Sequence, residues 1–259
     1  MIHVTHLSKW FPNQPVLNRV SFSVDEGESL VVLGQSGIGK SVLLKTLSRL
    51  IEPDEGFAEI RTRNIGIVFQ KNALFDSLSA YENLDFVMRE RTRETAPARR
   101  NKIMNYLEWV GLAGSAHLMP NELSGGMQKR LAIARTLIVE PQVVLYDEPT
   151  AGLDPITSRL IAELILRLKK EAGSTLVTVT SDVQRAFQLG TKVGILVRTA
   201  LGAELLMAGS PEEARASSDE RIQQFLKGAT RGPLTTKITA SSESRNNLAN
   251  KDFWDGDFF

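Results

Sequence analysis

The chain has 259 residues, of which 42% are hydrophobic and 24% are charged, and its formal net charge is +1. A balance this close to neutral excludes an overall basic footprint for nucleic acid. There are no cysteines, which excludes a disulfide framework and a zinc site built from cysteines. No apolar run approaches the roughly 20 residues that a spanning helix needs, so we expect any membrane contact to be peripheral or through a partner.

Residues 2–33 are predicted to form strands, and the last strand leads into a glycine-rich loop. Leu30–Leu33 is a short apolar run, typical of a strand buried on both faces. The sequence GQSGIGKS follows at 34–41 and fits G-x-x-x-x-G-K-S, and an apolar helical pattern then begins near Lys40. Strand, glycine loop and helix together predict a phosphate-binding loop, although a glycine-rich turn that only joins two elements is the alternative.

The residue types of this loop suit a nucleotide. Glycines let successive backbone N–H groups point inward at phosphate. Lys40 can reach the β- and γ-phosphates, and the Ser41 hydroxyl can ligate Mg²⁺. The predicted ATP-binding residues of this segment are Gly34, Gln35, Ser36, Gly37, Ile38, Gly39, Lys40, Ser41 and Val42.

Two flanking positions have open interpretations. Trp10 and Phe11 lie upstream of the loop, either as core contacts of an edge strand or as an aromatic face that stacks on a purine. Gln70 follows a short strand predicted at 65–69. Its amide can ligate Mg²⁺ or orient a water molecule, whereas a solvated loop residue is the alternative.

Residues 71–140 are predicted to be mainly helical. Ser79 and Glu82 have the spacing of a capping box, and a second apolar stripe ends at Gly111. The segment 89–102 carries six basic and two acidic residues. It is interpreted as a solvated face, with anionic lipid headgroups or an acidic partner as the alternative.

A second glycine-rich helix start occurs in LSGGMQ at 123–128. Ser124 can cap the following helix, and a serine with two glycines can form an anion cradle by the same physics as the first loop. A plain N-cap is the alternative, but two glycines in a first helical turn cost about 1 kcal/mol each relative to alanine.

The strand predicted at 143–147 ends in two carboxylates. Asp147 can hold Mg²⁺, and Glu148 is then placed to polarise an attacking water. Adjacent acids at a strand end repel each other, which favours a cation nearby. A turn, a helix at 156–171, a strand at 175–180 and two final strands follow, and then helix over 211–227. Beyond Gly228 the chain turns polar until its last nine residues, which contain four aromatics.

Taken in order, GQSGIGKS, Gln70, LSGGMQ, VVLYDEP and AGLD resemble the ATP-binding subunits of ABC transporters. The resemblance implies an α/β P-loop NTPase (RecA-like) core with an antiparallel β region and an inserted helical subdomain. It also implies hydrolysis of ATP, with Mg²⁺, in a head-to-tail pair of chains. The implied roles are adenine stacking by Phe11, contact with the partner's ATP by Ser124, Gly125, Gly126 and Gln128, catalysis by Glu148 with Gln70 and the position of Ser181, metal binding by Ser41, Gln70 and Asp147, and a dimer loop at Asp154.

A narrower resemblance, carried by LMPNELSGGM and DERIQQFLKGATRGP, is to the Mla/Mce-type ATPases of phospholipid transport. It implies an integral membrane permease as partner, an Mce-type lipid-binding protein reached through the permease, and a peripheral place on the cytoplasmic face of the inner membrane. Nucleic acid is not an expected partner. The expected division is an ABC ATPase domain at 1–228, with helices inserted at about 71–139, and a tail at 229–259 that is extended or docks on a partner.

The chain departs from the family pattern in two ways. Only about 30 residues separate Lys40 from Gln70, so the antiparallel region is expected to be trimmed. The family's switch histidine is replaced by Ser181, which predicts slow hydrolysis. A soluble ABC ATPase acting on nucleic acid or ribosomes is disfavoured, because the chain has one such domain, no room for a coiled coil between Lys40 and Ser124, and a net charge near zero. A nucleotide-gated clamp that hydrolyses little ATP stays open, because Ser181 replaces the histidine.

Overall fold

The computed structural model describes residues 1–12 and 14–235, and within them the strands form one nine-stranded sheet. The aromatic C-terminal end, interpreted either as a docking segment or as a frayed end, lies outside the described residues. The strands are β1 (Ile2–Phe11), β2 (Gln14–Val24), β3 (Ser29–Leu33), β4 (Glu55–Ile60), β5 (Ile65–Val68), β6 (Val143–Asp147), β7 (Thr175–Thr180), β8 (Lys192–Thr199) and β9 (Gly202–Gly209).

The helices are α1 (Lys40–Leu47), α2 (Ala80–Arg91), α3 (Ala96–Trp109), α4 (Gly125–Leu137), α5 (Pro155–Ala172), α6 (Val183–Leu189), α7 (Pro211–Ala216) and α8 (Glu220–Lys227), with short 3-10 turns η1 (Ala113–Ser115) and η2 (Pro120–Glu122). None of the helices in the described part of the chain is long and apolar enough to cross a membrane.

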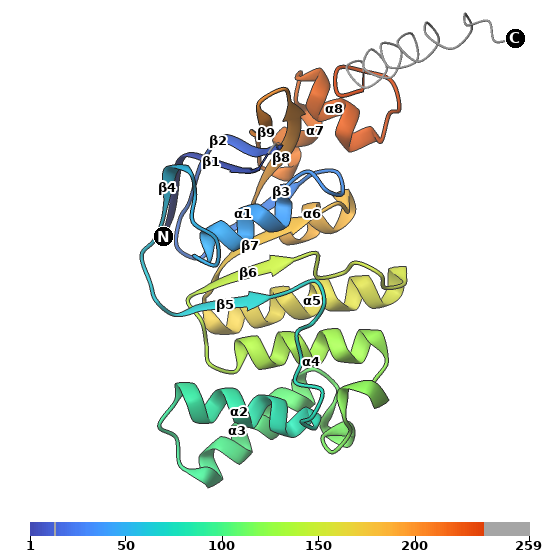
Figure 1. Ribbon diagram of the computed structural model, residues 1–259. Coiled ribbons are helices and arrows are strands. Elements are labelled where there is room, and N and C mark those ends of the chain that lie inside the picture. Colours follow the sequence, from blue (N-terminus) through green and yellow to red (C-terminus); the bar gives the residue numbers. More distant parts are fainter. Residues whose placement is uncertain (13, 236–259) are drawn as a thin grey trace, which may run out of the picture.

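The sheet joins a parallel half to an antiparallel half. Its strand order is β4-β1-β2-β9-β8-β3-β7-β6-β5, and β8, β3, β7, β6 and β5 run parallel. The β8–β9 hairpin leads into the other half, where β9 touches β2 through the pair Leu17 and Ala203. This confirms the expected α/β core with an antiparallel β region (Figure 1).

The central parallel strands are buried on both faces, which explains their continuous apolar sequences. In β3, Leu30 and Val32 pack in one core with α1, whereas Val31 and Leu33 pack in the other core with α5 and α6. Because successive strand residues point to opposite faces, one short segment serves two hydrophobic layers. Packing on both faces therefore holds the end of β3 in place, and with it the start of the glycine loop.

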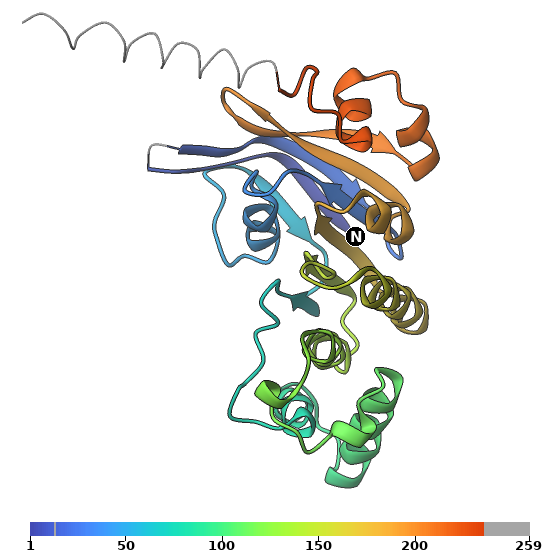
Figure 2. The same ribbon diagram turned by 90° about the vertical axis from the view of Figure 1, so that its right-hand side faces the viewer.

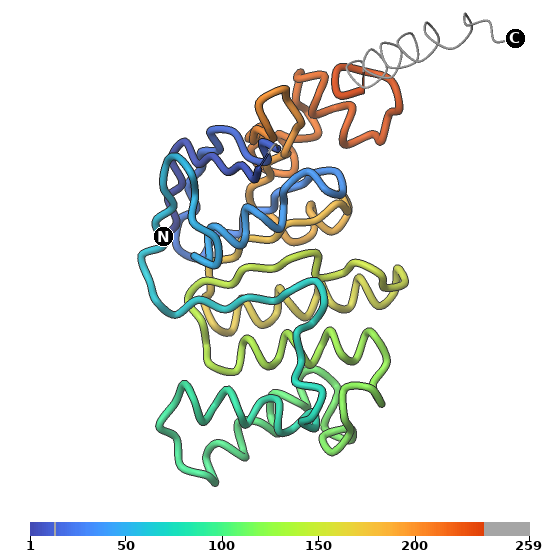
Figure 3. The backbone as a smooth tube through the Cα atoms, in the orientation of Figure 1, coloured from blue at the N-terminus to red at the C-terminus, as the bar shows by residue number. Residues whose placement is uncertain are grey.

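The helical unit is inserted between neighbouring strands of the sheet. From β5 the chain leaves the sheet, forms α2 and α3, and returns through α4 to β6 (Figure 3). Figures 1 and 2 both show α2 and α3 at the end of the molecule remote from α7 and α8. The capping box of Ser79 and Glu82 is present, and α3 is followed by Gly111 in the left-handed region. Both local predictions are thus confirmed.

The folded part continues beyond Gly228, where the sequence had predicted the start of the tail. Gln224 is buried, and its side-chain oxygen accepts a bond from the Leu234 N–H at 2.7 Å. Its side-chain nitrogen donates to the carbonyl of Ala229 at 3.1 Å, and Leu234 packs on the core. A buried amide needs such partners, so the chain up to Thr235 belongs to the domain.

Candidate functional site

The glycine loop connects β3 to α1 with a backbone that only glycine adopts readily. Gly37 and Gly39 have φ values of +73° and +119°. A Cβ on Gly39 would lie 2.9 Å from Cγ1 of Val16, so close packing against β2 also requires glycine there. Helix α1 begins at Lys40, which places its first N–H groups at the loop. The geometry is that of an anion-binding helix start.

Lys40 makes two hydrogen bonds within this loop and one ion pair beside it. Its Nζ donates to the carbonyls of Gly34 at 2.7 Å and Gln35 at 3.1 Å. The same atom lies 3.1 Å from Oε1 of Glu148, and the two side chains are only 6% and 13% exposed. The predicted phosphate-binding lysine and the predicted catalytic carboxylate are therefore in direct contact.

Oxygen ligands suited to Mg²⁺ lie beside this pair. Ser41 Oγ donates to Oδ1 of Asp147 at 3.0 Å. Burial raises the pKa of Asp147, and the Ser41 hydrogen bond acts in the opposite direction. Within the described residues there is no group of three or more His, Cys, Asp or Glu that could hold a metal. A hydroxyl and one carboxylate fit a Mg²⁺ ion that takes its other ligands from phosphates and water.

Glu148 is held in an unusual backbone conformation directly after β6. Its φ is +47°, and its N–H donates to the Val179 carbonyl of β7 at 2.9 Å. The backbone N–H of Ser181 donates to Oε2 of Glu148 at 3.2 Å. The strand ends of β6 and β7 thus bring Ser181 to the carboxylate across 33 positions of sequence. Gln70 follows β5, the neighbour of β6, with an exposed side chain.

The aromatic pair near the N-terminus is at the surface. Trp10 and Phe11 end β1 and are 46% and 40% exposed. Lys9 Nζ lies 5.5 Å from the centre of the Phe11 ring. The alternative that these two are core contacts is wrong, because the sheet leaves both rings at the solvent-facing end of a hairpin. Adenine stacking by Phe11 stays a prediction.

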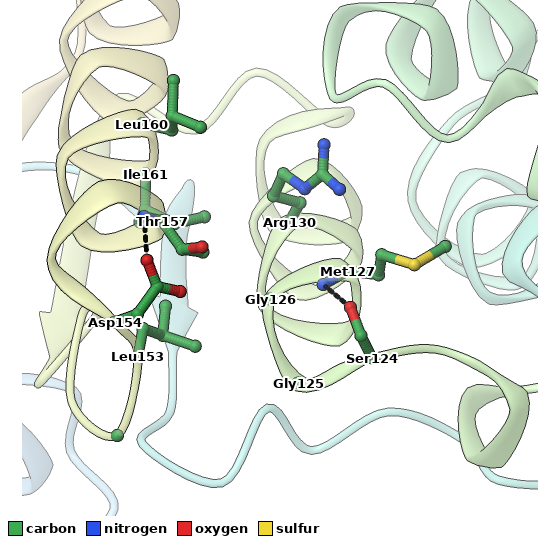
Figure 4. Close-up of a pocket in the computed structure, with 11 residues that line it drawn as sticks. Ser124, Gly125, Gly126, Met127, Arg130, Leu153, Asp154, Thr157, Leu160 and Ile161 are labelled. Atoms are coloured by element: carbon green, nitrogen blue, oxygen red, sulfur yellow. Dashed lines mark hydrogen bonds between the residues drawn. The ribbon is translucent and has the colours of Figure 1, made fainter.

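The second glycine-rich helix start lines a separate pocket of about 380 Å³ (Figure 4). Ser124 Oγ accepts from the Met127 N–H at 3.3 Å and so caps α4. Across the pocket, Asp154 accepts from the N–H groups of Ile156 and Thr157, both at 3.0 Å, and caps α5. Hydrogen bonds from Thr157 lower the pKa of Asp154. The lining residues are Ser124, Gly125, Gly126, Met127, Arg130, Gly152, Leu153, Asp154, Thr157, Leu160 and Ile161.

None of the residues that line this pocket belongs to the glycine loop of 34–41 or to the pair Asp147 and Glu148. One chain therefore presents two glycine-rich helix starts in separate places. Gln128, predicted to contact a partner's ATP, turns its amide nitrogen to the carbonyls of Pro120 and Leu123 at 2.9 and 3.1 Å. In the structure it holds the loop before the motif.

Sequence reasoning missed one buried cation next to the site. Lys129 is 3% exposed, and its Nζ donates to the backbone carbonyl of Gln70 at 2.9 Å. Burial lowers the pKa of Lys129, and the charge of Asp147 acts in the opposite direction. The sequence did contain a signal for this contact. Lys129 and Thr136 are seven residues apart, which places two polar side chains on the same face of α4.

A parallel sheet with a phosphate-binding loop, strand-end carboxylates and an inserted helical unit that carries a second glycine-rich helix start defines an ATP-binding cassette. The family model described as ABC transporter matches residues 17–151. The chain belongs to this family and is an ATP-binding subunit of an ABC transporter.

Individual relatives cover most of the chain. The intermembrane phospholipid transport system ATP-binding protein MlaF of Escherichia coli K12 is 35% identical, over 88% of this chain and 89% of MlaF. MlaF of Haemophilus influenzae is 34% identical, over 93% of this chain and 95% of that protein. The probable ribonucleotide transport ATP-binding protein mkl of Mycobacterium leprae is 37% identical, over 90% of this chain and 70% of that protein.

Solved cassettes have the same fold. The dimeric structure of a bacterial ABC transporter cassette superposes with a TM-score of 0.69 at 32% identity, over 75% of this chain and 94% of that one. A dimeric post-hydrolysis state of the same cassette, bound to ADP and Pi, gives a TM-score of 0.68 at 31% identity. The fold expected from the sequence is thus confirmed.

Proposed function

We propose that this chain hydrolyses ATP as a homodimer and thereby drives a separate integral membrane permease that moves phospholipid. The observation that carries the ATPase part is the cluster of Lys40, Ser41, Asp147 and Glu148 at one end of the parallel sheet. The phospholipid substrate is supported by the match to two MlaF proteins over 89% and 95% of their lengths. An Mce-type lipid-binding protein behind the permease and a place on the cytoplasmic face of the inner membrane follow from the same resemblance.

Each residue of the cluster has a role in this proposal. Lys40 and the loop N–H groups bind the β- and γ-phosphates, and Phe11 stacks on the adenine. Ser41, Asp147 and the Gln70 amide hold Mg²⁺, whose charge neutralises the phosphate oxygens. Glu148 accepts the proton of the attacking water, and its strained backbone and its bond from Ser181 N–H fix the carboxylate.

The second copy supplies Ser124, Gly125 and Gly126. The support is that these residues and the glycine loop occupy different surfaces of one chain, and that the similar solved cassettes are dimers. Asp154 shares the pocket and would lie in the same interface. With Glu148→Gln, water activation is lost while binding remains, so ATP and Mg²⁺ should trap a dimer in size-exclusion chromatography. A strictly monomeric variant, with its membrane partner present, would refute the homodimer.

Turnover is proposed to be slow because Ser181 stands in place of the switch histidine. Serine reaches the γ-phosphate only through a bridging water, and the loss of one well-placed donor costs on the order of 10²–10³ in rate. Steady-state hydrolysis by the wild type, Ser181→Ala and Ser181→His, each assembled with the permease, tests this. The proposal predicts that Ser181→His is fastest. Equal rates for all three would remove position 181 from catalysis.

The second candidate, a clamp that binds ATP and barely hydrolyses it, is favoured by the same Ser181. The two functions differ in one measurement. Multiple turnovers coupled to movement of labelled phospholipid in proteoliposomes with the permease support the transporter, whereas a single burst of hydrolysis supports the clamp. Labelled ribonucleotide belongs in the same assay, because the mycobacterial relative carries that substrate in its name.

The permease is proposed to dock beside the segment between Gln70 and α2. Leu74 packs inward on the core, whereas Phe75 and Phe86 are 40% and 45% exposed. The two rings meet edge-on, with 4.8 Å between their centroids. An exposed aromatic pair of this kind suits a short amphipathic helix. Leu78 lies in the same segment and is half-buried, so Leu78→Asp should weaken co-purification with the permease and leave ATP affinity unchanged. Normal co-purification would count against this surface.

A further inference from the structure

Two side-chain bonds hold helix α4 to the edge strand β5 and to the loop that follows it. Thr136 Oγ1 donates to the carbonyl of Ile67 at 3.2 Å, and Lys129 Nζ donates to the carbonyl of Gln70 at 2.9 Å. Lys129, the earlier residue of α4, bonds the later carbonyl, and Thr136 bonds the earlier one, so α4 runs in the opposite direction to β5. β5 ends the sheet, and α4 covers its free edge.

The two fastenings differ greatly in energetic cost. Thr136 is a neutral hydroxyl that also bonds within its own helix, to Ala132 at 3.0 Å. Lys129 is an ammonium that is 3% exposed, and no carboxylate in the described chain lies within 4.0 Å of it. Burying such an ion without a charged partner is unfavourable. One hydrogen bond to a neutral carbonyl does not offset that penalty.

The position of Lys129 suggests why an unfavourably buried cation is present: it lies between two parts of the site. Gln70 follows β5, whose neighbour β6 ends in Asp147. Gly126 is one turn before Lys129 on α4, and Ser124 caps the same helix. A helix of this length moves as a rigid element, so a shift of the Gln70 backbone is transmitted to its start. The bond from Lys129 thus connects the metal side of one ATP site with the surface that faces the other copy.

We propose that Lys129 is a positioning residue that couples the Gln70 loop to Ser124–Gly126. Nucleotide bound at one glycine loop then places the signature residues for the nucleotide of the partner copy. This inference rests on the homodimer proposed above and deepens it, because it names the contact through which the two ATP sites influence each other. Allosteric couplings of this kind amount to about 5- to 150-fold in affinity.

The test compares full-length variants in the Glu148→Gln background, so that turnover does not enter. Two quantities are measured for each: the affinity of the monomer for a fluorescent ATP analogue, and the ATP concentration that gives half-maximal dimer. Lys129→Met should leave monomer affinity within about threefold and raise the ATP needed for dimerisation about tenfold or more. Lys129→Arg, which keeps a cationic donor, should restore most of the dimerisation.

Thr136→Val is the matched control. It removes the other bond between α4 and β5 without changing charge or touching Gln70, so it should lower the melting temperature and leave dimerisation unchanged. If Lys129→Met does not fold, Lys129→Gln, one bond shorter and uncharged, should shift dimerisation in the same direction. Equal effects of Lys129→Met and Thr136→Val on dimerisation, or no effect of either, would overturn the coupling. A Glu148→Gln parent that never dimerises would refute the homodimer itself.

Discussion

Replacing Gly125 by alanine should stabilise the isolated chain and inactivate the assembled one. Gly125 is the first residue of α4, its φ is not in the left-handed region, and a Cβ added there meets no atom within 4 Å in its own chain. Gly126 is less informative, since its Cβ would lie 2.9 Å from Cγ2 of Thr157 and would disturb the fold directly. Gly125→Ala therefore probes the surface that we propose faces the partner.

The two effects have opposite signs. Alanine is up to about 1 kcal/mol better than glycine in a helix, which corresponds to a rise of about 2–4 °C in the melting temperature of a chain of this size. The new methyl group would stand where the partner's phosphate must approach the start of α4. Loss of a preorganised donor to that phosphate costs about 10²–10³ in rate.

The assay pairs thermal unfolding of the isolated chain with steady-state ATP hydrolysis by the complex. Gly152→Ala, in the same pocket, is the control for both measurements. Gly152 has a φ of +76°, so alanine is strained there and should lower the melting temperature. Wild-type hydrolysis by Gly125→Ala would refute contact between this helix start and nucleotide. A lower melting temperature would refute the open space seen beside Gly125.

Two further predictions concern stability. Gly66→Ala should cost about 1–3 kcal/mol by overpacking, because its Cβ would lie 2.6 Å from Cγ2 of Thr136 and 3.0 Å from Cγ of Pro141; an unchanged denaturation midpoint would contradict this. Asp219→Asn should destabilise by at most about 1 kcal/mol at pH 7, since the pair with Arg221 is solvent-accessible. Arg221 lowers the pKa of Asp219 to about 2, so this stabilisation is complete above the ordinary aspartate pKa and is lost as pH falls toward 2, where the two melting temperatures should converge.

Local chemistry was predictable from the sequence. The strand and helix around the glycine loop, the capping box at Ser79 and the cap at Ser124 are confirmed. Each depends on residues within a few positions of one another, and such short-range preferences are intrinsic to the chain. The strand predicted at 65–69 lies at 65–68, because pairing with a neighbour sets where a strand ends.

Long-range contacts were not predictable. The pairing of Lys40 with Glu148 joins positions 108 apart, and it exists because β3 and β6 both flank β7 in the sheet. The fastening of Gln70 by Lys129 is equally non-local, and a lysine in a helix is ordinarily assigned to the solvated face. The same holds for Leu234, whose place on the core depends on the buried amide of Gln224. The order of residues along the chain does not directly specify which distant residues come into contact.

The contact between Lys40 and Glu148 makes ATP binding an anion exchange. A phosphate that reaches the Lys40 ammonium replaces a carboxylate already bonded to it at 3.1 Å, so the lysine trades one negative partner for another. The carboxylate set free is the group that we propose as acceptor of the water proton. Glu148→Gln removes this internal competitor as well as the base, so the variant should bind ATP more tightly than the wild type for reasons unrelated to hydrolysis. Affinities measured in that background therefore set an upper limit on the natural affinity.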